Sequence, residues 1–392
     1  MNFENVNVNI IRQHSKNPYF REFFYRSAVA WAWALSAPSH ARLDSTTMQA
    51  PDPARTALPS GRDRSAVTLR EVAERAGVSM ITVSRAINMP QQVSERTRER
   101  VQEAVLALGY VPNLVAGGLR SARSHVVTAL VPTLTGPLFG EMVQALTDAL
   151  ELRGFQVMVG QVGYARSRED ALLRAIVGRR PDGIVLTGVM HSPEGRRLLM
   201  ASGIPVVETW DFTDTPIDML VGLRHEALGA AVCEHLFARG RRRLALLSGG
   251  DERAARRAQG FADAAARLGL RPPAVRLGKS PTTHADGRAG LAALLADVPD
   301  IDAVFCSSDM LALGVLTETR ARGIAVPQQL AVVGFGDIDF AETVTPALST
   351  VRIDGTRMGQ TAAGWIADRA EGKTVAQPVV DIGFSIVERG SS

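Results

Sequence analysis

Residues 68–88, TLREVAERAGVSMITVSRAIN, decide the fold of the N-terminal part of the protein. Thr68 followed three residues later by Glu71 is the pattern of a capping box that opens a helix. Apolar residues then recur at helical spacing as far as Gly77, a residue that tolerates the left-handed backbone of a helix end. Ser79 can cap a second helix directly after this turn. The stretch therefore predicts two short helices joined by a tight glycine turn, which is a helix-turn-helix.

A third helix is expected immediately downstream. Ser94 can cap it, Gly109 can end it, and its apolar face comprises Val101, Ala104, Val105 and Leu108. In a helix-turn-helix the second helix enters the major groove of DNA. The same pattern also fits a helical hairpin in an ordinary protein core, so the surrounding sequence has to decide between the two.

Residues 67–121 resemble the headpiece of the LacI family of bacterial transcription repressors. The matching motifs are, in order, VTLREVAERAGVS, TVSRAIN, VSERTRERVQEAVLALGYVPN and LVAGGL. The resemblance implies that Met80 and Ile81, at the start of the second helix, face base edges. Both are apolar at positions where the family often has polar residues, which leaves the operator sequence open. Further DNA contacts are expected from Thr68, Ser79, Thr82, Ser84, Arg85, Asn88, Tyr110, Asn113 and Ala116.

The resemblance also implies a hinge helix over Asn113–Leu119. Leu119 would be the apolar wedge that enters the minor groove and kinks the duplex. Gly117 and Gly118 stand where the family prefers better helix formers, and each glycine costs roughly 1 kcal/mol in a helix. We therefore expect this hinge to order only on DNA.

Composition agrees with a protein of several domains that binds a polyanion. The chain has 392 residues, of which 46% are hydrophobic and 21% charged, and its net charge is +4. Residues 65–125 contain eight Arg and five Glu, a net charge of +3, as phosphate contact requires.

Cys233 and Cys306 lie in apolar runs and are expected to be buried free thiols, which suits a reducing cytoplasm. The chain lacks a run of 18 apolar residues, so we expect no membrane-spanning helix.

Residues 1–64 fall outside the family pattern. The run AVAWAWALSA at 28–37 resembles the apolar region of a signal peptide. The alternatives are a poorly ordered extension with a short helix near Tyr19–Leu35, and a misassigned start with Met48 as the initiator. We favour these two, because a secreted DNA-binding domain makes little sense. The expected domains are then the extension, a headpiece at 65–112, a hinge and linker at 113–125, and a core at 126–390.

The core shows short apolar runs that alternate with helical stretches. This alternation predicts parallel sheets covered by helices on both faces, and its length requires two doubly wound subdomains. Ligands in such folds bind at the carboxyl ends of the strands, here in the cleft between the halves. Strands are expected at 126–134, 155–162, 183–187, 205–209, 244–248, 303–307 and 331–335, and helices at 139–152, 168–177, 193–201, 254–268 and 310–322.

The LacI resemblance extends over this core as well, to about residue 390. It implies an α/β periplasmic-binding-protein-like fold of two subdomains with three crossings between them. The first subdomain would comprise 126–223 and 337–372. The second would comprise 224–336 and a C-terminal strand near 373–390.

One stretch points to a particular group within the family. Residues 179–222, with LTG, HSPE, PVVETWD and PIDM, resemble the gluconate-operon repressors. That group usually continues with Phe-Ser-Asn, whereas this chain has Leu223-Arg224-His225. The departure falls near the crossing between subdomains and leaves the identity of the effector open.

In the family an arginine anchors the effector, and it corresponds to Arg257 here. A guanidinium fork suits the carboxylate of an aldonate such as gluconate, although Arg256 and Arg257 could instead be solvated helix charges. Asp309 could equally be only a helix N-cap, and Trp210 only a core residue. Gly336 stands where the family usually has a ligand-binding Asp, so Asp337 or Asp339 would take over. The expected effector contacts are Thr133, Phe139, Glu208, Trp210, Arg257, Ser308, Asp309 and Asp337.

The leading hypothesis is a cytoplasmic, homodimeric transcription regulator that is released from a palindromic operator by a sugar acid. We expect a dimer without membrane contact, cofactor or metal; His125 and His191 lack metal-ligand spacing and are interpreted as surface residues. An enzyme is disfavoured, because nucleophile-elbow, P-loop and dinucleotide motifs are missing from the sequence. The alternative is an exported sugar-binding protein with the same bilobal core.

Overall fold

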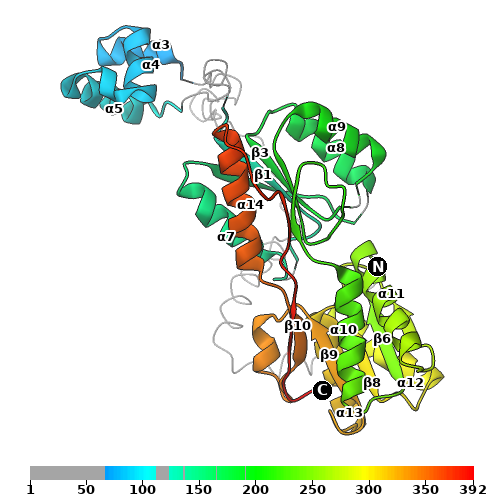
Figure 1. Cartoon of the computed structure of the whole chain (residues 1–392). Coiled ribbons are helices and arrows are strands. Elements are labelled where there is room, and N and C mark those ends of the chain that lie inside the picture. The colour runs from blue at the N-terminus through cyan, green and yellow to red at the C-terminus, as the bar shows by residue number, and fades with distance from the viewer. Residues whose placement is uncertain (1–66, 112–122, 136, 165, 190) are drawn as a thin grey trace, which may run out of the picture. The chain divides into compact units, whose positions relative to one another are not determined.

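The computed structural model describes residues 67–111, 123–135, 137–164, 166–189 and 191–392. The chain divides into two compact units, the first ending at Tyr110 and the second beginning at Val111 (Figure 1). The expectations for the extension at 1–64 and for Asn113, Ala116 and Leu119 in the hinge lie outside the described residues.

The first unit contains the predicted helix-turn-helix. Its elements are α3 (Leu69–Ala76), α4 (Met80–Asn88), the 3-10 turn η2 (Pro90–Gln92) and α5 (Glu95–Leu108). Thr68 and Glu71 form the expected capping box, and Gly77 ends α3 with a φ of 62°. A small core of valines and alanines holds the helices together, formed by Val72, Ala73, Ala76, Val83, Ala86, Val101 and Ala104.

The second unit has two lobes, each built on a six-stranded sheet (Figure 1). The sheet of the first lobe is wholly parallel, in the order β11-β5-β4-β3-β1-β2. Helices α7 (Gly140–Glu151) and α14 (Gly355–Ala370) pack together on one face, and α8 (Arg166–Val177) and α9 (Pro193–Ser202) on the other. The strands are β1 (Val126–Val131), β2 (Gln156–Gln161), β3 (Gly183–Thr187), β4 (Val206–Thr209), β5 (Met219–Gly222) and β11 (Val379–Asp381).

The sheet of the second lobe runs in the order β12-β10-β9-β8-β6-β7 and is parallel except for β12 at its edge. Helices α10 (His225–Ala238) and α11 (Glu252–Arg267) cover one face, and α12 (His284–Asp297) and α13 (Asp309–Arg322) the other. The strands are β6 (Leu244–Ser248), β7 (Ala274–Leu277), β8 (Ala303–Cys306), β9 (Ala331–Phe335), β10 (Ser349–Arg352) and β12 (Ser385–Val387), with the short helix η3 (Asp339–Glu342) between β9 and β10.

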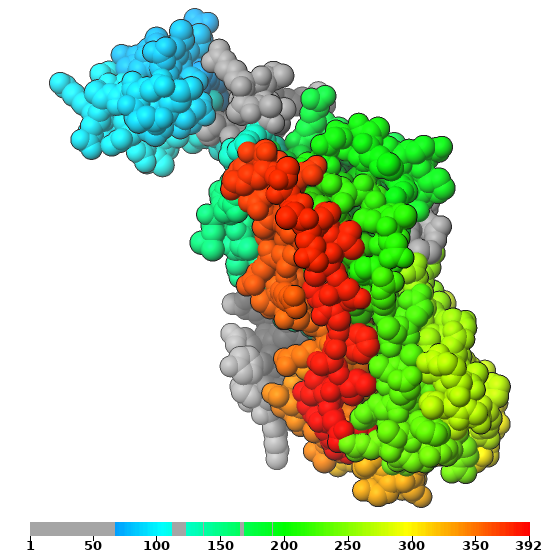
Figure 2. All heavy atoms as spheres, in the orientation of Figure 1, coloured from blue at the N-terminus to red at the C-terminus, as the bar shows by residue number. Residues whose placement is uncertain are grey.

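The crossings between the lobes correct the subdomain limits expected from the sequence. The first crossing lies after β5, as expected. The second follows β10 and not β9, because β10 continues the second sheet by pairing with β9. The third lies between β11 and β12, because β11 pairs with β5 in the first sheet. Figure 2 shows the C-terminal residues as a continuous strip from one lobe to the other.

The expected strands and helices are present within a few residues, but several further elements were not predicted. Helix α10, HEALGAAVCEHLFA, is apolar on most sides because it packs against both a sheet and α11, so it shows no single apolar stripe. Strand β7 lies at a sheet edge with mostly exposed residues, so it lacks the apolar run of a buried strand. The others are β5, α12, β10, α14 and β11, whereas β12 is the C-terminal strand expected in the second lobe.

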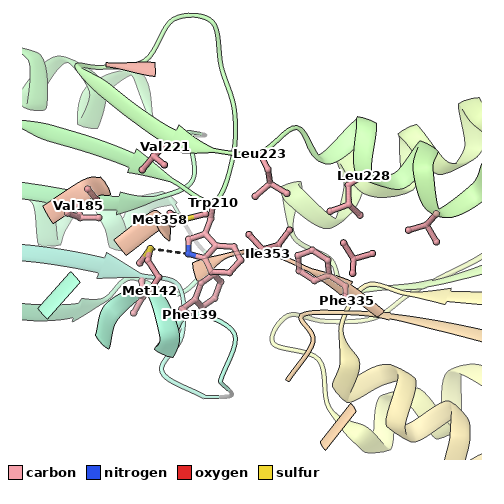
Figure 3. Packing of buried hydrophobic residues seen from close by; sticks show 14 of the residues in the cluster. Phe139, Met142, Val185, Trp210, Val221, Leu223, Leu228, Phe335, Ile353 and Met358 are labelled. Atoms are coloured by element: carbon pink, nitrogen blue, oxygen red, sulfur yellow. Dashed lines mark hydrogen bonds between the residues drawn. The ribbon is translucent and has the colours of Figure 1, made fainter. Parts of the chain in front are cut away.

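The two lobes share one continuous apolar core. Residues of both sheets belong to the same cluster of buried side chains. Figure 3 shows Trp210, Phe139 and Met142 grouped in the first lobe, with Phe335 and Leu228 beyond them in the second. Cys233 and Cys306 are buried free thiols, as predicted. None of the described helices is both long and apolar enough to cross a membrane.

Helices α10 and α11 touch backbone to backbone, and two glycines allow this contact. A Cβ atom on Gly229 would lie 2.0 Å from the carbonyl oxygen of Arg257, and one on Gly260 would lie 1.9 Å from that of Glu226. The close approach brings the start of α10 beside the middle of α11.

We predict that Gly260→Ala destabilises the protein by about 1–3 kcal/mol, because the added methyl group forces the two helices apart. Gly364→Ala is the matched control, since Gly364 lies in helix α14 and its Cβ would meet nothing within 4 Å. That substitution should stabilise the protein by about 0.5–1 kcal/mol. Thermal unfolding of both variants tests the packing argument; equal melting temperatures would contradict it.

Candidate functional site

Helix α4 exposes two apolar side chains and an arginine on the surface of the first unit. Met80 is 51% exposed and Ile81 65% exposed, whereas Val83 on the opposite side is fully buried. Ser79 caps the helix, and its hydroxyl lies 2.8 Å from that of Thr82. The exposed surface therefore begins at the first turn of the helix and includes Arg85.

The other predicted DNA contacts in the first unit are divided between surface and core. Thr68 is exposed but engages its hydroxyl with Glu71. Asn88 is exposed and donates its amide to the Ser84 carbonyl at 2.9 Å. Tyr110 packs in part against the core of the unit.

A pocket in the second unit lies between the two lobes, at the carboxyl ends of their strands. Its empty space is about 800 Å³, a volume that includes open solvent. Six of the predicted effector residues line it, namely Thr133, Phe139, Trp210, Arg257, Ser308 and Asp309. Its other polar and aromatic lining residues include Thr135, Tyr164, His225, Asp251, Arg253, Ser280, Thr282, Ser307 and Phe335.

Arg257 is the buried cation of this pocket. It is only 5% exposed, and its guanidinium lies 4.3 Å from the centroid of the Phe335 ring. Burial lowers the pKa of Arg257 to about 10, so the group remains charged at neutral pH. Its Nε atom has no hydrogen-bond partner among the described residues. Arg257 is therefore not a solvated charge on the helix surface. Its neighbour Arg256 donates a hydrogen bond to the buried Asp211 carboxylate at 3.0 Å.

Asp251 and Arg253 add a second pair of opposite charges. Asp251 caps α11 by accepting from the Ala254 amide and also accepts the Ser280 hydroxyl at 2.8 Å. Burial alone would raise the pKa of Asp251, but the charges of Arg257 and Arg253 bring it below its ordinary value. Arg253 donates to the Thr187 carbonyl at 3.2 Å. The pocket thus combines the guanidinium groups of Arg253 and Arg257, the carboxyl groups of Asp251 and Asp309, and several hydroxyls.

Trp210 and His225 connect the pocket to the crossing between lobes. Trp210 has a φ of 62°, in the left-handed region that is strained for an aromatic residue. Its indole donates to the Met142 sulfur at 3.1 Å and meets the Phe139 ring edge-on (Figure 3). Burial and the nearby Arg257 charge lower the pKa of His225 well below its ordinary value, so this imidazole is neutral.

Ser308 and Asp309 have different roles from those weighed in the sequence. Ser308 is the N-cap of α13, accepting from the Leu311 amide. Asp309 is the first residue within the helix, and its carboxylate accepts the Thr350 hydroxyl at 2.6 Å and the Ile338 amide at 3.0 Å. Burial raises the pKa of Asp309 to about 6. The N-cap interpretation of Asp309 was therefore wrong.

Two predicted effector residues do not line the pocket. Glu208 points to the sheet face covered by α8 and α9, because alternation along β4 sends its neighbours Val207 and Thr209 to the other face. Asp337 directs its carboxylate to Arg389 at 2.7 Å and Arg352 at 3.3 Å. Glu208 and Asp337 were both expected to contact the effector, but neither side chain lines the pocket.

His191 is not a surface residue, as the sequence suggested, but the centre of a buried group of charges. Its Nδ1 lies 2.5 Å from a Glu169 oxygen and its Nε2 lies 3.3 Å from a Glu208 oxygen. The His191 side chain is 4% exposed and that of Glu208 is fully buried. Burial alone would lower the pKa of His191, but the two carboxylates outweigh it and raise the pKa to about 9.

The pocket residues that sequence reasoning missed carried weak signals. His225 was visible only as a departure from the resembling group of repressors. Arg253 lies four residues before Arg257 on α11, so helical spacing could have found it. Asp251 is the N-cap of this helix, and a capping aspartate does not by itself indicate a pocket residue. Ser280 comes from a loop whose position depends on the tertiary fold.

We predict that His191→Gln destabilises the protein by about 3–5 kcal/mol near neutral pH, because Glu208 would keep a buried charge without its cation. The folded-state pKa of His191 lies above the unfolded value of about 6.5. Its contribution is therefore fully present below pH 6.5 and is lost as the pH rises through about 9. The difference in melting temperature between the variant and the natural protein should shrink accordingly. His284→Gln, whose imidazole bonds the Thr317 hydroxyl, is the control; a difference that stays constant up to pH 10 would refute the ion-pair argument.

Comparisons with known proteins agree with both units. A family model described as bacterial regulatory proteins, lacI family, matches residues 68–113, and one for a periplasmic binding protein-like domain matches residues 233–392. The HTH-type transcriptional regulator GntR of Pseudomonas aeruginosa is 39% identical over 83% of this chain and 95% of its own length.

Two solved structures are similar to this chain. A LacI-family transcriptional regulator from Silicibacter pomeroyi has a TM-score of 0.79 and 32% identity, covering 83% of this chain and 99% of its own. The lac repressor dimer bound to operator and the anti-inducer ONPF has a TM-score of 0.72 and 26% identity, covering 83% and 99%. The chain therefore belongs to the LacI family of DNA-binding transcription regulators.

Proposed function

We propose that this protein binds a palindromic operator as a homodimer, represses transcription there, and is released by a sugar acid of the gluconate class that binds in the pocket between the lobes. The observation that carries the effector proposal is the buried, charged Arg257 with its unpartnered Nε. The family is one of regulators and not of enzymes. Its helix-turn-helix favours this function over that of an exported sugar-binding protein.

The exposed start of α4 supports the DNA part of the proposal. N-terminal residues of a recognition helix are those that reach base edges in the major groove. Met80 and Ile81 have this position and this exposure. Apolar side chains recognise the methyl group of thymine, so we infer an operator with A·T pairs at the positions that these two residues read.

Exposed apolar side chains on two edge strands support a dimer. Strand β2 lies at one edge of the first sheet and exposes Met158 and Val159. Strand β7 lies at one edge of the second sheet and exposes Val275 and Leu277. Exposed apolar groups on sheet edges favour association with another chain. The lac repressor, to which the chain is similar, is described as a dimer on its operator.

The chemistry of the pocket supports a sugar acid as effector. A guanidinium offers paired donors to a carboxylate, and such charge-assisted hydrogen bonds are stronger inside a buried site. The hydroxyls of Thr133, Ser280 and Thr282 and the carboxylate of Asp251 suit the hydroxyls of a polyol chain. The relative from Pseudomonas aeruginosa is named GntR, in line with the gluconate-repressor motifs at 179–222.

The test measures binding of the protein to DNA from upstream of its own gene at fixed salt, by fluorescence anisotropy. Gluconate should release the DNA, whereas glucose, which lacks the carboxylate, should not. Arg257→Gln should raise the gluconate concentration for half release by about tenfold or more, because a charged hydrogen bond is lost.

Arg267→Gln is the matched control, because Arg267 lies on the same helix but is exposed and pairs with Glu234. It should leave release unchanged. Release by another sugar acid but not by gluconate would overturn the choice of gluconate, and release by none would overturn the effector class. Failure to bind any DNA selected from random duplexes would overturn the regulator.

The operator inference has its own prediction. Once an operator has been selected from random duplexes, replacing a contacted thymine by uracil removes only its methyl group. Affinity should fall about fourfold for each contacted methyl, from roughly 0.8 kcal/mol of apolar burial. Ile81→Ala should abolish the difference in affinity between thymine and uracil at the position that Ile81 contacts. Gln102→Ala, a substitution of an exposed residue on α5, should preserve this difference. Uracil tolerated at every position would contradict the inference.

A further inference from the structure

His225 lies where the chain crosses from the first lobe to the second. It is the first residue of α10 and is only 1% exposed. Its Nε2 lies 2.9 Å from the carbonyl oxygen of Trp210, which follows strand β4 of the first lobe. Its Nδ1 lies 3.2 Å from Nη1 of Arg257 on α11 of the second lobe. A single imidazole thus bonds both lobes at the wall of the pocket.

The partners determine the proton positions on this imidazole. A carbonyl oxygen can only accept, so Nε2 carries the hydrogen and donates it to Trp210. A guanidinium can only donate, so Nδ1 is bare and accepts from Arg257. The neutral imidazole expected from its lowered pKa agrees with this assignment. With the Nε2–H tautomer both bonds form together, whereas an imidazolium or the other tautomer would break the bond to Arg257.

Arg257 has few other fixed bonds. Its Nη2 donates to the Ser307 carbonyl at a long 3.4 Å, and its Nε has no partner among the residues that the structure describes. The Phe335 ring supports the face of the guanidinium but does not fix its rotation. The bond to His225 is therefore the contact that sets which donors of Arg257 turn toward the pocket.

We propose that His225 is a positioning residue for the effector: its Nδ1 holds the Arg257 guanidinium in the orientation that binds the effector carboxylate, while its Nε2 is anchored to Trp210 in the other lobe. This proposal rests on the function proposed above. It assigns to this chain a specificity determinant that does not itself have to touch the ligand.

The anchor at Trp210 gives the arrangement its rigidity. The left-handed backbone at Trp210 turns its carbonyl toward His225, and the indole is locked by Phe139 and Met142. Strained backbone of this kind persists where the surroundings hold it and is frequent at binding sites. Any movement of one lobe against the other changes the distance between Trp210 and Arg257, the two groups that His225 connects.

Two substitutions separate the two bonds of His225. In asparagine the amide oxygen occupies the place of Nδ1, so His225→Asn keeps an acceptor for Arg257 and loses the bond to Trp210. In glutamine the amide nitrogen reaches the place of Nε2, so His225→Gln keeps the donor for Trp210 and loses the acceptor for Arg257. His235→Asn and His235→Gln, on the same helix with a bond to the Ser392 hydroxyl, are the matched controls.

The experiment measures, for each variant, operator affinity without effector, thermal stability and the gluconate concentration for half release. We expect His225→Gln to raise that concentration about tenfold or more, with half release measured relative to the variant's own operator binding without effector. His225→Asn keeps the acceptor for Arg257 but loses the anchor at Trp210, so it should raise the concentration much less than His225→Gln does, and the controls should leave it unchanged. Equal losses in Asn and Gln variants, or normal release in the Gln variant, would overturn the proposal.

A second measurement does not need an effector and so separates this proposal from the proposed function. Long-range ¹H–¹⁵N spectra of histidine-labelled protein, with His225 assigned from the His225→Asn variant, report the protonation of each ring nitrogen. We expect a neutral Nε2–H tautomer from pH 6 to 8, with an Nδ1 shift that changes in Arg257→Gln. An Nδ1–H tautomer, an imidazolium, or no response to Arg257→Gln would overturn the assignment, even if gluconate were not the effector.

Discussion

The pocket depends on one backbone contact, the crossing of α10 and α11 at Gly229 and Gly260. Side chains normally keep two helices 8–10 Å apart, but here the space for a Cβ atom is already occupied by the carbonyl oxygens of the facing helix. Only because of this approach can the first residue of α10 reach a side chain in the middle of α11. The bond between His225 and Arg257 is thus a consequence of two residues that have no side chain.

The same contact explains how a cation can be buried in this core. Arg257 is buried at the pocket wall beside a continuous apolar cluster that extends over both lobes, where an isolated charge would be costly. The negative charge of Asp251 stabilises the guanidinium through space, and the face of the Phe335 ring packs against it. His225 is neutral, so it accepts a hydrogen bond from Arg257, whereas a charged imidazolium would repel the guanidinium. Burial first, and then the charges of three neighbouring arginines, lower the pKa of His225 and keep the imidazole neutral, although its bond to the Trp210 carbonyl acts in the opposite direction.

Sequence reasoning succeeded where the physical cause is local. Capping, glycine ends and helical spacing depend on a few consecutive residues, so the helix-turn-helix and most central strands could be predicted. It failed where the cause lies far away in the chain. The second crossing follows from pairing of β10 with β9, and the position of Glu208 follows from strand parity combined with knowing which helices cover each face. His191 was misinterpreted for the same reason, because Glu169 and Glu208 meet it only in the folded protein.

The unpartnered Nε of Arg257 connects the stability of the core with its function. A buried donor without an acceptor costs free energy in the folded protein, and a ligand carboxylate that accepts from it removes this cost on binding. The free energy of binding of such a ligand is therefore more favourable than its other contacts alone would make it, provided that the guanidinium is already oriented before the ligand binds. The atom that orients the guanidinium is Nδ1 of His225, which lies at the crossing between the lobes. Binding of a carboxylate to Arg257 and the relative position of the lobes therefore both affect the hydrogen bond between His225 and Arg257. A ligand that prefers one distance between Trp210 and Arg257 will therefore shift the lobes toward it, which is the differential affinity that allostery requires.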